Sequence, residues 1–352
     1  MRILDRTRQG ALANIQTGFG RSGFWLLACV GAWLVWVLAS SLLTGQHLSP
    51  WSPHLVAPVV LALGSLVGIV LAQCWAQKKP VVPAAVVLAI IAFAVPIYAN
   101  ASAAVGALLL ALAFMSYLEA KRSSEPKVGL DLYDVTVQGE RHTKQRVVAT
   151  GIGTIGFLMC FGSQAVLALT VPLLILSFLS SRMKRGLPRW LVVGVGIFLV
   201  EMAAIAVLTL GLRDSWPSWL SAGDSLSSAR HTLWSDALKL WRLNPITGAG
   251  PGTFTESSDL ASSTTHLRAA HSSVLQVGAE LGVIGVVLLA AIFIAGLLVA
   301  TRGNRTRGLI AGAAWTFLAI HSTIDHLEDF PVVALTAGIV LGRAGSAPPP
   351  SR

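Results

Sequence analysis

The sequence predicts an all-α protein that crosses a membrane many times, and its composition and charge distribution carry this prediction. Of the 352 residues, 54% are hydrophobic and only 12% are charged. A soluble domain has about 25% charged residues. No charged residue occurs in three long stretches, which cover 22–77, 80–118 and 147–181, and a helix needs only about 20 apolar residues to cross a bilayer. The composition therefore excludes a soluble enzyme, a nucleic-acid-binding protein and a disordered chain.

Apolar runs, and the turn residues between them, define ten expected spans. The first is expected to be a retained anchor, because its apolar run exceeds the roughly 7–15 residues of a signal peptide. The last is the shortest, with an uninterrupted apolar run only over 330–342. In chain order the expected spans are 24–44, 55–75, 80–98, 102–118, 147–162, 164–180, 189–212, 274–300, 308–324 and 329–342.

The distribution of Lys and Arg tests this arrangement independently. With a cytoplasmic N-terminus, alternate segments hold 21 of the 26 cations, and the other five lie together in residues 213–273 on the opposite side. One span too many or too few would place the later Lys- and Arg-rich segments on the wrong side of the membrane. Ten spans are therefore expected, with both termini in the cytoplasm. The protein is expected in the inner or plasma membrane. The expected parts are a basic cytoplasmic N-terminus (1–23), seven spans (24–212) with a cytoplasmic loop at 119–146, an extracytoplasmic loop (213–273), three spans (274–343) and a disordered tail (344–352).

The 61-residue loop 213–273 is expected to have structure of its own. Apolar residues recur at helical spacing over 228–241, which predicts an amphipathic helix that could lie on the membrane surface. An Asn-Pro pair ends this helix and begins the sequence NPITGAGPGTF at 244–254. Its three glycines allow a tight turn with exposed amides, which is either an anion-binding nest or a plain turn.

Two motifs in and after this loop resemble the O-antigen ligase and O-antigen polymerase superfamily. That family has His, then Asn, Ser or Gln, nine residues, Gly, two residues and Gly. This pattern fits His271-Ser272, nine intervening residues, Gly282, two residues and Gly285. Upstream, Arg230 through Trp234 is similar to the family's Arg-x-x-Leu-Trp helix. The sequence at 244–254 is similar to its Pro-x-x-Gly-x-Gly-Pro-Gly-x-Phe turn. The resemblance covers roughly residues 160–330.

The resemblance implies a membrane glycosyltransferase that moves a glycan from an undecaprenyl-diphosphate-type carrier to an acceptor hydroxyl on a lipid or a glycan. His271 matches the family's essential His, and Arg230 matches an essential Arg of the loop. Gln164 stands where the family has a second Arg, so Arg242 or Arg268 could supply that charge in substrate binding.

The residues themselves point to the same chemistry. Nucleotide sugars are not available outside the cytoplasm, so a transfer reaction there needs a donor carried in the lipid. The forked donors of Arg230 suit the charge that develops on a diphosphate leaving group. The imidazole of His271 can take a proton from a hydroxyl near neutral pH. Attack opposite the diphosphate would invert the anomeric centre, and no metal or other cofactor is expected.

The two proposed catalytic residues also have structural interpretations. His271 could be an interfacial histidine at the start of the eighth span, and Arg230 could be a solvated cation on the amphipathic helix. On a straight helix, three glycines would share the face of His271 and form a groove for close helix packing. These glycines are Gly278, Gly282 and Gly285.

Other polar residues near the predicted site leave further alternatives open. Arg268 would lie next to the catalytic His on a continuous helix, whereas Glu280 would lie on the opposite face and is expected to make a structural hydrogen bond. His321 and Asp325 are spaced i, i+4 with His326 adjacent. This spacing could hold a divalent metal, but no third ligand is apparent. A polar helix end is therefore favoured, or Asp325 lines the acceptor entrance.

Three other functions remain open. The same chemistry could polymerise repeat units instead of ligating them to a different acceptor. A transporter or flippase for lipid-linked glycans would need ionisable residues near the midplane of several spans, and only Glu201 and Glu280 qualify. An intramembrane hydrolase would need a nucleophile paired with His271, and nothing marks Ser163, near an outer helix end, as activated.

Overall fold

The computed structural model describes residues 2–76, 81–95, 97–123, 132–182, 187–216 and 225–346, and these residues contain helices and no strand. The longer helices are α1 (Arg2–Thr44), α2 (Pro53–Ala76), α3 (Val81–Ala94), α4 (Ala99–Ser123), α5 (Leu132–Cys160), α6 (Gln164–Arg182), α7 (Arg189–Gly211), α12 (Ser273–Ala300), α13 (Arg305–Thr323) and α14 (Pro331–Gly345). The polar loop adds α9 (Ser225–Leu243), α10 (Phe254–Ser257) and α11 (Asp259–Ser263), and a 3-10 turn, η1 (Leu327–Asp329), precedes α14.

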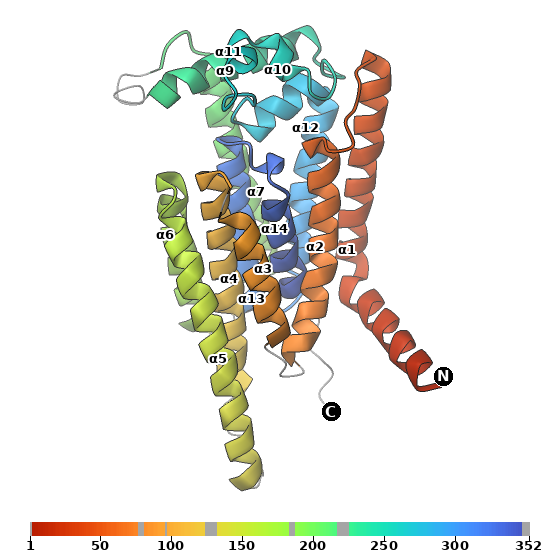
Figure 1. Ribbon diagram of the computed structural model, residues 1–352, viewed down its shortest axis with the longest axis vertical. Coiled ribbons are helices and arrows are strands. Elements are labelled where there is room, and N and C mark those ends of the chain that lie inside the picture. Colours follow the sequence, from red (N-terminus) through yellow and green to blue (C-terminus); the bar gives the residue numbers. More distant parts are fainter. Residues whose placement is uncertain are drawn as a thin grey trace.

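The longer helices form an elongated bundle with a smaller layer across one end (Figure 1). This layer, here called the cap, consists of residues 225–272 and contains α9, α10 and α11. The first residues of α1 and the last of α14 lie toward the opposite end. Within the bundle, α2 packs along α14, α4 along α5, and α1 along α12, while α13 contacts both α6 and α7.

The predicted fold class is confirmed. Each of the ten expected spans contains a helix. Five described helices, α1, α2, α4, α7 and α12, are long and apolar enough to cross a membrane, and α3, α6 and α14 contain shorter apolar segments. The chain is therefore an all-α polytopic membrane protein, and ten crossings remain the predicted number.

Helices extend further than the expected spans. α1 runs through the basic N-terminus with a break at Gly20, where φ is 46°, and α4 and α5 both reach into the loop expected at 119–146. α14 continues to Gly345, past the expected start of the tail. Charged residues end an apolar run without ending a helix, because Lys, Arg and Glu are good helix formers. Parts of the expected loops and tail lie outside the described residues, at 77–80, 124–131, 183–186, 217–224 and 347–352.

The helix that follows the cap, α12, is broken at Gly282. The backbone there has φ 67° and ψ −167°, which glycine adopts most readily. The break frees backbone groups from the helix ladder, and Trp36 of α1 satisfies one of them by donating to the Leu281 carbonyl at 3.0 Å. The turn at 244–250 satisfies three more through Ala249 N–Ala279 O, Gly250 N–Glu280 O and Val283 N–Pro245 O, each 2.9 Å.

Glycines allow this close contact between the turn and α12. A Cβ atom at Gly282 would lie 2.1 Å from the Ile246 carbonyl oxygen, and one at Gly248 would lie 2.2 Å from the Glu280 carbonyl carbon. Of the three glycines expected to form a groove on α12, Gly282 faces this turn, whereas Gly278 faces Trp241 and Gly285 faces side chains of α12 itself. The glycine-rich turn at 244–254 and the start of α12, which carry motifs that are separate in the sequence, therefore pack directly against each other.

The amphipathic helix predicted over 228–241 is confirmed as α9. Its apolar side chains are buried in a second hydrophobic core, away from the main core of the bundle, which includes Leu233, Trp234, Phe254 and Leu275. α9 contacts α12 and α7. Because the protein itself covers this apolar face, the expectation that it could rest on a membrane surface is wrong.

Candidate functional site

His271 lies between α11 and α12, directly before the residue that caps α12. Its φ of 49° is the one positive value among the described residues other than glycine. Ser272 caps the helix by accepting a hydrogen bond from Leu275 N at 3.4 Å, and the indole of Trp234 donates to the His271 carbonyl at 3.4 Å. A left-handed conformation costs a residue with a side chain about 1–3 kcal/mol, and such strain is concentrated at functional sites.

Because α12 begins at Ser273, His271 is not part of this helix. The predicted sharing of one helical face by His271 and the glycines of α12 is therefore wrong. For the same reason Arg268, which lies in a non-helical segment, is not a helical neighbour of His271.

The side chain of His271 faces Asp325, which follows α13. The Nδ1 atom of His271 and the Nδ1 atom of His326 lie 3.3 and 2.9 Å from the same carboxylate oxygen, Oδ1. The other oxygen, Oδ2, accepts a hydrogen bond from Asn100 at 2.6 Å. These four residues are here called the Asp325 cluster. His321 lies at its edge, with Nε2 3.8 Å from Oδ2.

The His271 side chain is buried, and its hydrogen bond to Asp325 sets the roles of its two ring nitrogens. The residue is 4% exposed, and Asp325 is 1% exposed. An ionised carboxylate only accepts hydrogen bonds, so the Nδ1 atom of His271 is the donor to Asp325 and Nε2 is the other ring nitrogen. Among the described residues Nε2 has no hydrogen-bond partner.

Hydrogen bonds keep Asp325 ionised in spite of its burial. Burial alone would raise the pKa of this carboxyl group, but the hydrogen bonds with His271 and His326 outweigh that effect and hold the pKa well below its ordinary value. Burial would likewise lower the pKa of His326, and the bond to Asp325 raises it instead. The cluster therefore combines an ionised carboxylate with an imidazole that favours its charged form.

Arg230 reaches the same cluster from the cap. Its guanidinium, on α9, lies beside the hydroxyl of Tyr98, which accepts a hydrogen bond from the Asn100 amide at 2.8 Å. Asn100 in turn donates to Asp325. Hydrogen bonds thus connect Tyr98 to Asp325 and His271 through Asn100, with Arg230 beside them, although these residues come from distant parts of the sequence.

A second network fixes the backbone next to His271. The Glu280 carboxylate, 1% exposed, accepts hydrogen bonds from Gly252 N at 2.8 Å, Phe254 N at 3.3 Å, and the His54 and Gln276 side chains at 2.7 and 2.5 Å. Gln276 then accepts from Ala270 N at 2.7 Å. The turn at 244–254 therefore does form an anion-binding nest, which the chain's own Glu280 occupies. The predicted structural hydrogen bond of Glu280 is confirmed.

An apolar cavity of about 370 Å³ adjoins the Asp325 cluster. Its walls come mainly from α2, α7, α12, α13 and α14, and its few polar residues include Glu328 and Ser273. The Ser273 hydroxyl donates to the Glu328 carboxylate and also lies 3.3 Å from the Asp325 carbonyl. Burial, together with repulsion from Asp329, raises the pKa of Glu328 to about 7.

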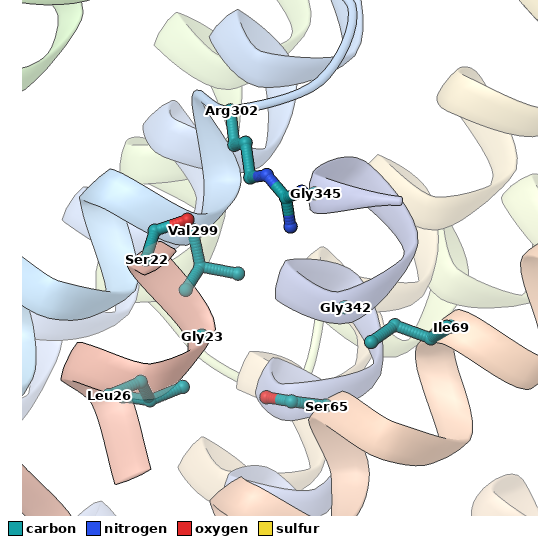
Figure 2. A pocket seen from close by; sticks show the side chains of 9 residues that line it. All are labelled: Ser22, Gly23, Leu26, Ser65, Ile69, Val299, Arg302, Gly342 and Gly345. Atoms are coloured by element: carbon teal, nitrogen blue, oxygen red, sulfur yellow. The ribbon is translucent and has the colours of Figure 1, made fainter. Parts of the chain in front are cut away.

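A second pocket lies toward the other end of the bundle and is much smaller. Figure 2 shows Ser22 and Arg302 beside it, together with Gly345 near the end of α14. Its volume is about 10 Å³, which is room for roughly one water molecule. It is therefore too small for a substrate, and the 370 Å³ cavity is the candidate.

The structure brings together some of the predicted site residues and not others. His271, Arg230 and Asp325 converge, whereas Gln164, Arg242 and Arg268 are exposed. In the part of the chain that the structure describes, the side chains of these last three make no hydrogen bond or ion pair. Asp325 is buried under His271 instead of lining an entrance.

Sequence reasoning missed Tyr98, Asn100 and Glu328. All three lie in or beside short segments between predicted spans, where a pattern of apolar runs gives no information on side-chain partners. Their proximity to Asp325 depends on tertiary packing, because Tyr98 and Asn100 precede it by more than two hundred residues.

The expectation that a metal site would lack a third ligand is also wrong. The fold adds His271, and one ligand atom from each of His271, Asp325 and His326 lies within 4.8 Å of the others. Such a set could hold a divalent cation. The same atoms are satisfied by hydrogen bonds to Asp325, so the geometry does not require one.

A family model described as O-antigen ligase matches residues 148–290. The matched range runs from α5 to α12 and contains both Arg230 and His271. No curated protein matches the chain.

Proposed function

Because residues 148–290 match a family model described as O-antigen ligase, we propose that this chain is a membrane glycosyltransferase that moves a glycan from a polyprenyl-diphosphate carrier to an acceptor hydroxyl. The observation that best supports the proposal is the buried His271, with Nδ1 against Asp325 and Nε2 unpartnered in the described residues. A general base needs a lone pair held in this way. The carboxylate sets the tautomer and stabilises the imidazolium that forms.

In the proposed reaction, Nε2 of His271 takes the proton of the acceptor hydroxyl while the hydroxyl oxygen attacks the anomeric carbon. A new glycosidic bond forms as the bond between the anomeric carbon and the diphosphate oxygen breaks. The electron pair of the broken bond stays on the diphosphate, and Arg230 stabilises its charge. Attack from the face opposite the diphosphate inverts the anomeric centre, and no step uses a metal or a cofactor.

The apolar cavity supports a lipid-linked donor. Most of its lining is apolar, and its polar residues include Ser273 and Glu328, which are close in the chain to His271 and Asp325. An isoprenoid chain in this cavity would leave its diphosphate near the Asp325 cluster and Arg230. Gln164, Arg242 and Arg268 remain proposed substrate contacts from the exposed surface.

The proposed reaction takes place on the extracytoplasmic side, with both chain termini in the cytoplasm. The charge distribution supports this side, because the cap belongs to the segment with only five of the 26 cations. The test is a single cysteine at exposed Ser262, introduced after replacing Cys29, Cys74 and Cys160. A membrane-impermeant maleimide should label it in intact cells, and labelling only after permeabilisation would contradict this orientation.

The transfer reaction is tested with purified protein, a polyprenyl-diphosphate-linked glycan and two acceptors, a further repeat unit and a lipid-linked core glycan. The two acceptors separate polymerisation from ligation. His271→Ala and Arg230→Ala should abolish most transfer, whereas Arg242→Ala and Arg268→Ala, which remove exposed cations, should have smaller effects. Unimpaired transfer by both His271→Ala and Arg230→Ala would overturn the proposal.

A further inference from the structure

We propose that the hydroxyl group of Tyr98 is a further substrate-binding group, which donates its proton to an oxygen of the substrate's diphosphate beside Arg230. This inference rests on the proposed function, because it assigns a partner for the same leaving group.

The position of Tyr98 is defined by contacts on both of its sides. It directly precedes α4, and its ring stacks on Phe330 with a centroid distance of 5.6 Å and an interplanar angle of 19°. The His326 ring lies 5.4 Å from it. The residue as a whole is only half-buried. The ring is therefore held in place by packing while part of the side chain remains open to a ligand.

The directions of the hydrogen bonds around Tyr98 follow from the chemistry of its partners. Asp325 only accepts, so the Asn100 group that contacts it is the amide NH₂, and the second hydrogen of that NH₂ points to the Tyr98 oxygen. The Arg230 guanidinium lies beside the same hydroxyl and, because it has donors only, it cannot take the phenol proton. The phenol oxygen therefore accepts the hydrogen bond from Asn100.

An oxygen that accepts a hydrogen bond still has its own proton to donate. Among the described residues, the Tyr98 hydroxyl donates no hydrogen bond. This proton and the N–H groups of Arg230 are neighbouring donors for which the described residues supply no hydrogen-bond acceptor. An anionic oxygen of a diphosphate supplies that acceptor, because hydrogen bonds to charged oxygens are the strong ones.

The inference is tested by equilibrium binding of three lipids to the reconstituted full-length protein: a polyprenyl diphosphate, the monophosphate and the neutral polyprenol. Tyr98→Phe removes one oxygen and keeps the ring. It should weaken diphosphate binding by about 10- to 100-fold, since a hydrogen bond to a charged group contributes about 1.5–3 kcal/mol. Binding of the polyprenol should be unchanged. The KM for the diphosphate donor should rise more than kcat falls.

Two further variants separate a contact of the hydroxyl from a structural effect. Tyr117→Phe removes the same oxygen from a half-exposed site within α4 and should bind all three lipids like the wild type. Phe330→Leu loosens the packing of the Tyr98 ring, keeps its hydroxyl, and should not reproduce the selective loss of diphosphate binding.

The outcomes distinguish this inference from the proposed function. If the wild type transfers glycan and Tyr98→Phe binds diphosphate as tightly as the wild type, the inference is wrong and the proposed function stands. Equal weakening of diphosphate and polyprenol in Tyr98→Phe would also overturn it, because this result indicates a packing role. If the wild type neither binds the diphosphate nor transfers glycan, the proposed function itself fails.

Discussion

The Nδ1 atom of His271 lies 3.3 Å from Oδ1 of Asp325, and 54 positions of sequence separate the two residues. The same carboxylate oxygen is 2.9 Å from Nδ1 of His326. Asp325 therefore orients two imidazoles at once, and its replacement should affect the reaction more than the fold.

Asp325→Asn should lower turnover by roughly 100-fold or more, because a neutral amide neither fixes the tautomer of His271 nor stabilises its protonated form. The measurement is kcat for glycan transfer, with thermal unfolding in detergent as a check on folding. Asp214→Asn, at an exposed position, is the matched control. Wild-type turnover in Asp325→Asn would show that His271 does not need this carboxylate.

Glu280→Gln should destabilise the protein by about 3–5 kcal/mol, because it leaves the buried His54 and two backbone N–H groups without a charged acceptor. The midpoint of thermal unfolding should fall accordingly. Glu201→Gln removes an exposed carboxylate from α7 and should leave the midpoint unchanged. Equal midpoints for the two variants would mean that the nest at 244–254 does not depend on Glu280.

The protein should lose stability as the pH rises from about 4.5 to 7, through the titration of Glu328. Burial raises the folded-state pKa of this group from 4.5 to about 7, so the folded protein holds its proton over a range in which the unfolded chain has released it. Its stabilising contribution is complete below the lower pH and lost above the higher one. Unfolding midpoints measured across this range should vary less in Glu328→Gln than in the wild type. Glu256→Gln, at an exposed position, should keep the wild-type dependence.

Chelation of divalent cations should leave glycan transfer unchanged, because the proposed mechanism needs a free lone pair on Nε2 of His271. The assay is transfer after dialysis against EDTA, combined with metal analysis of the purified protein. Loss of transfer that zinc or manganese restores would instead assign a metal to His271, Asp325 and His326, whose ligand atoms lie within 4.8 Å of one another.

Much of the fold could be predicted because bilayer crossing imposes a strong pattern on the sequence. All ten expected spans contain helices, and α9 was visible in the spacing of its apolar residues. The break at Gly282 could not be predicted from the apolar run around it. Its stability depends on hydrogen bonds from a turn more than thirty residues away, and periodicity contains no information about such partners.

The residues of the candidate site could likewise be predicted only in part. His271 and Arg230 were found because they belong to motifs with fixed spacing. Asp325 was noticed but given a different role, since its burial under His271 follows from the packing of α13 against other helices. Tyr98 and Asn100 belong to no motif, and only the folded chain shows that Asn100 connects Tyr98 to Asp325 beside Arg230.

The interlocking of residues 244–254 with the first turns of α12 limits how this protein can be recombined with its relatives. A chimera that exchanges only the polar loop would bring in a foreign turn against a native helix break, and the backbone hydrogen bonds across the junction would no longer match. A functional exchange should therefore extend through Gly285. The segment that must be exchanged to transfer acceptor or donor preference would then include part of a membrane-spanning helix.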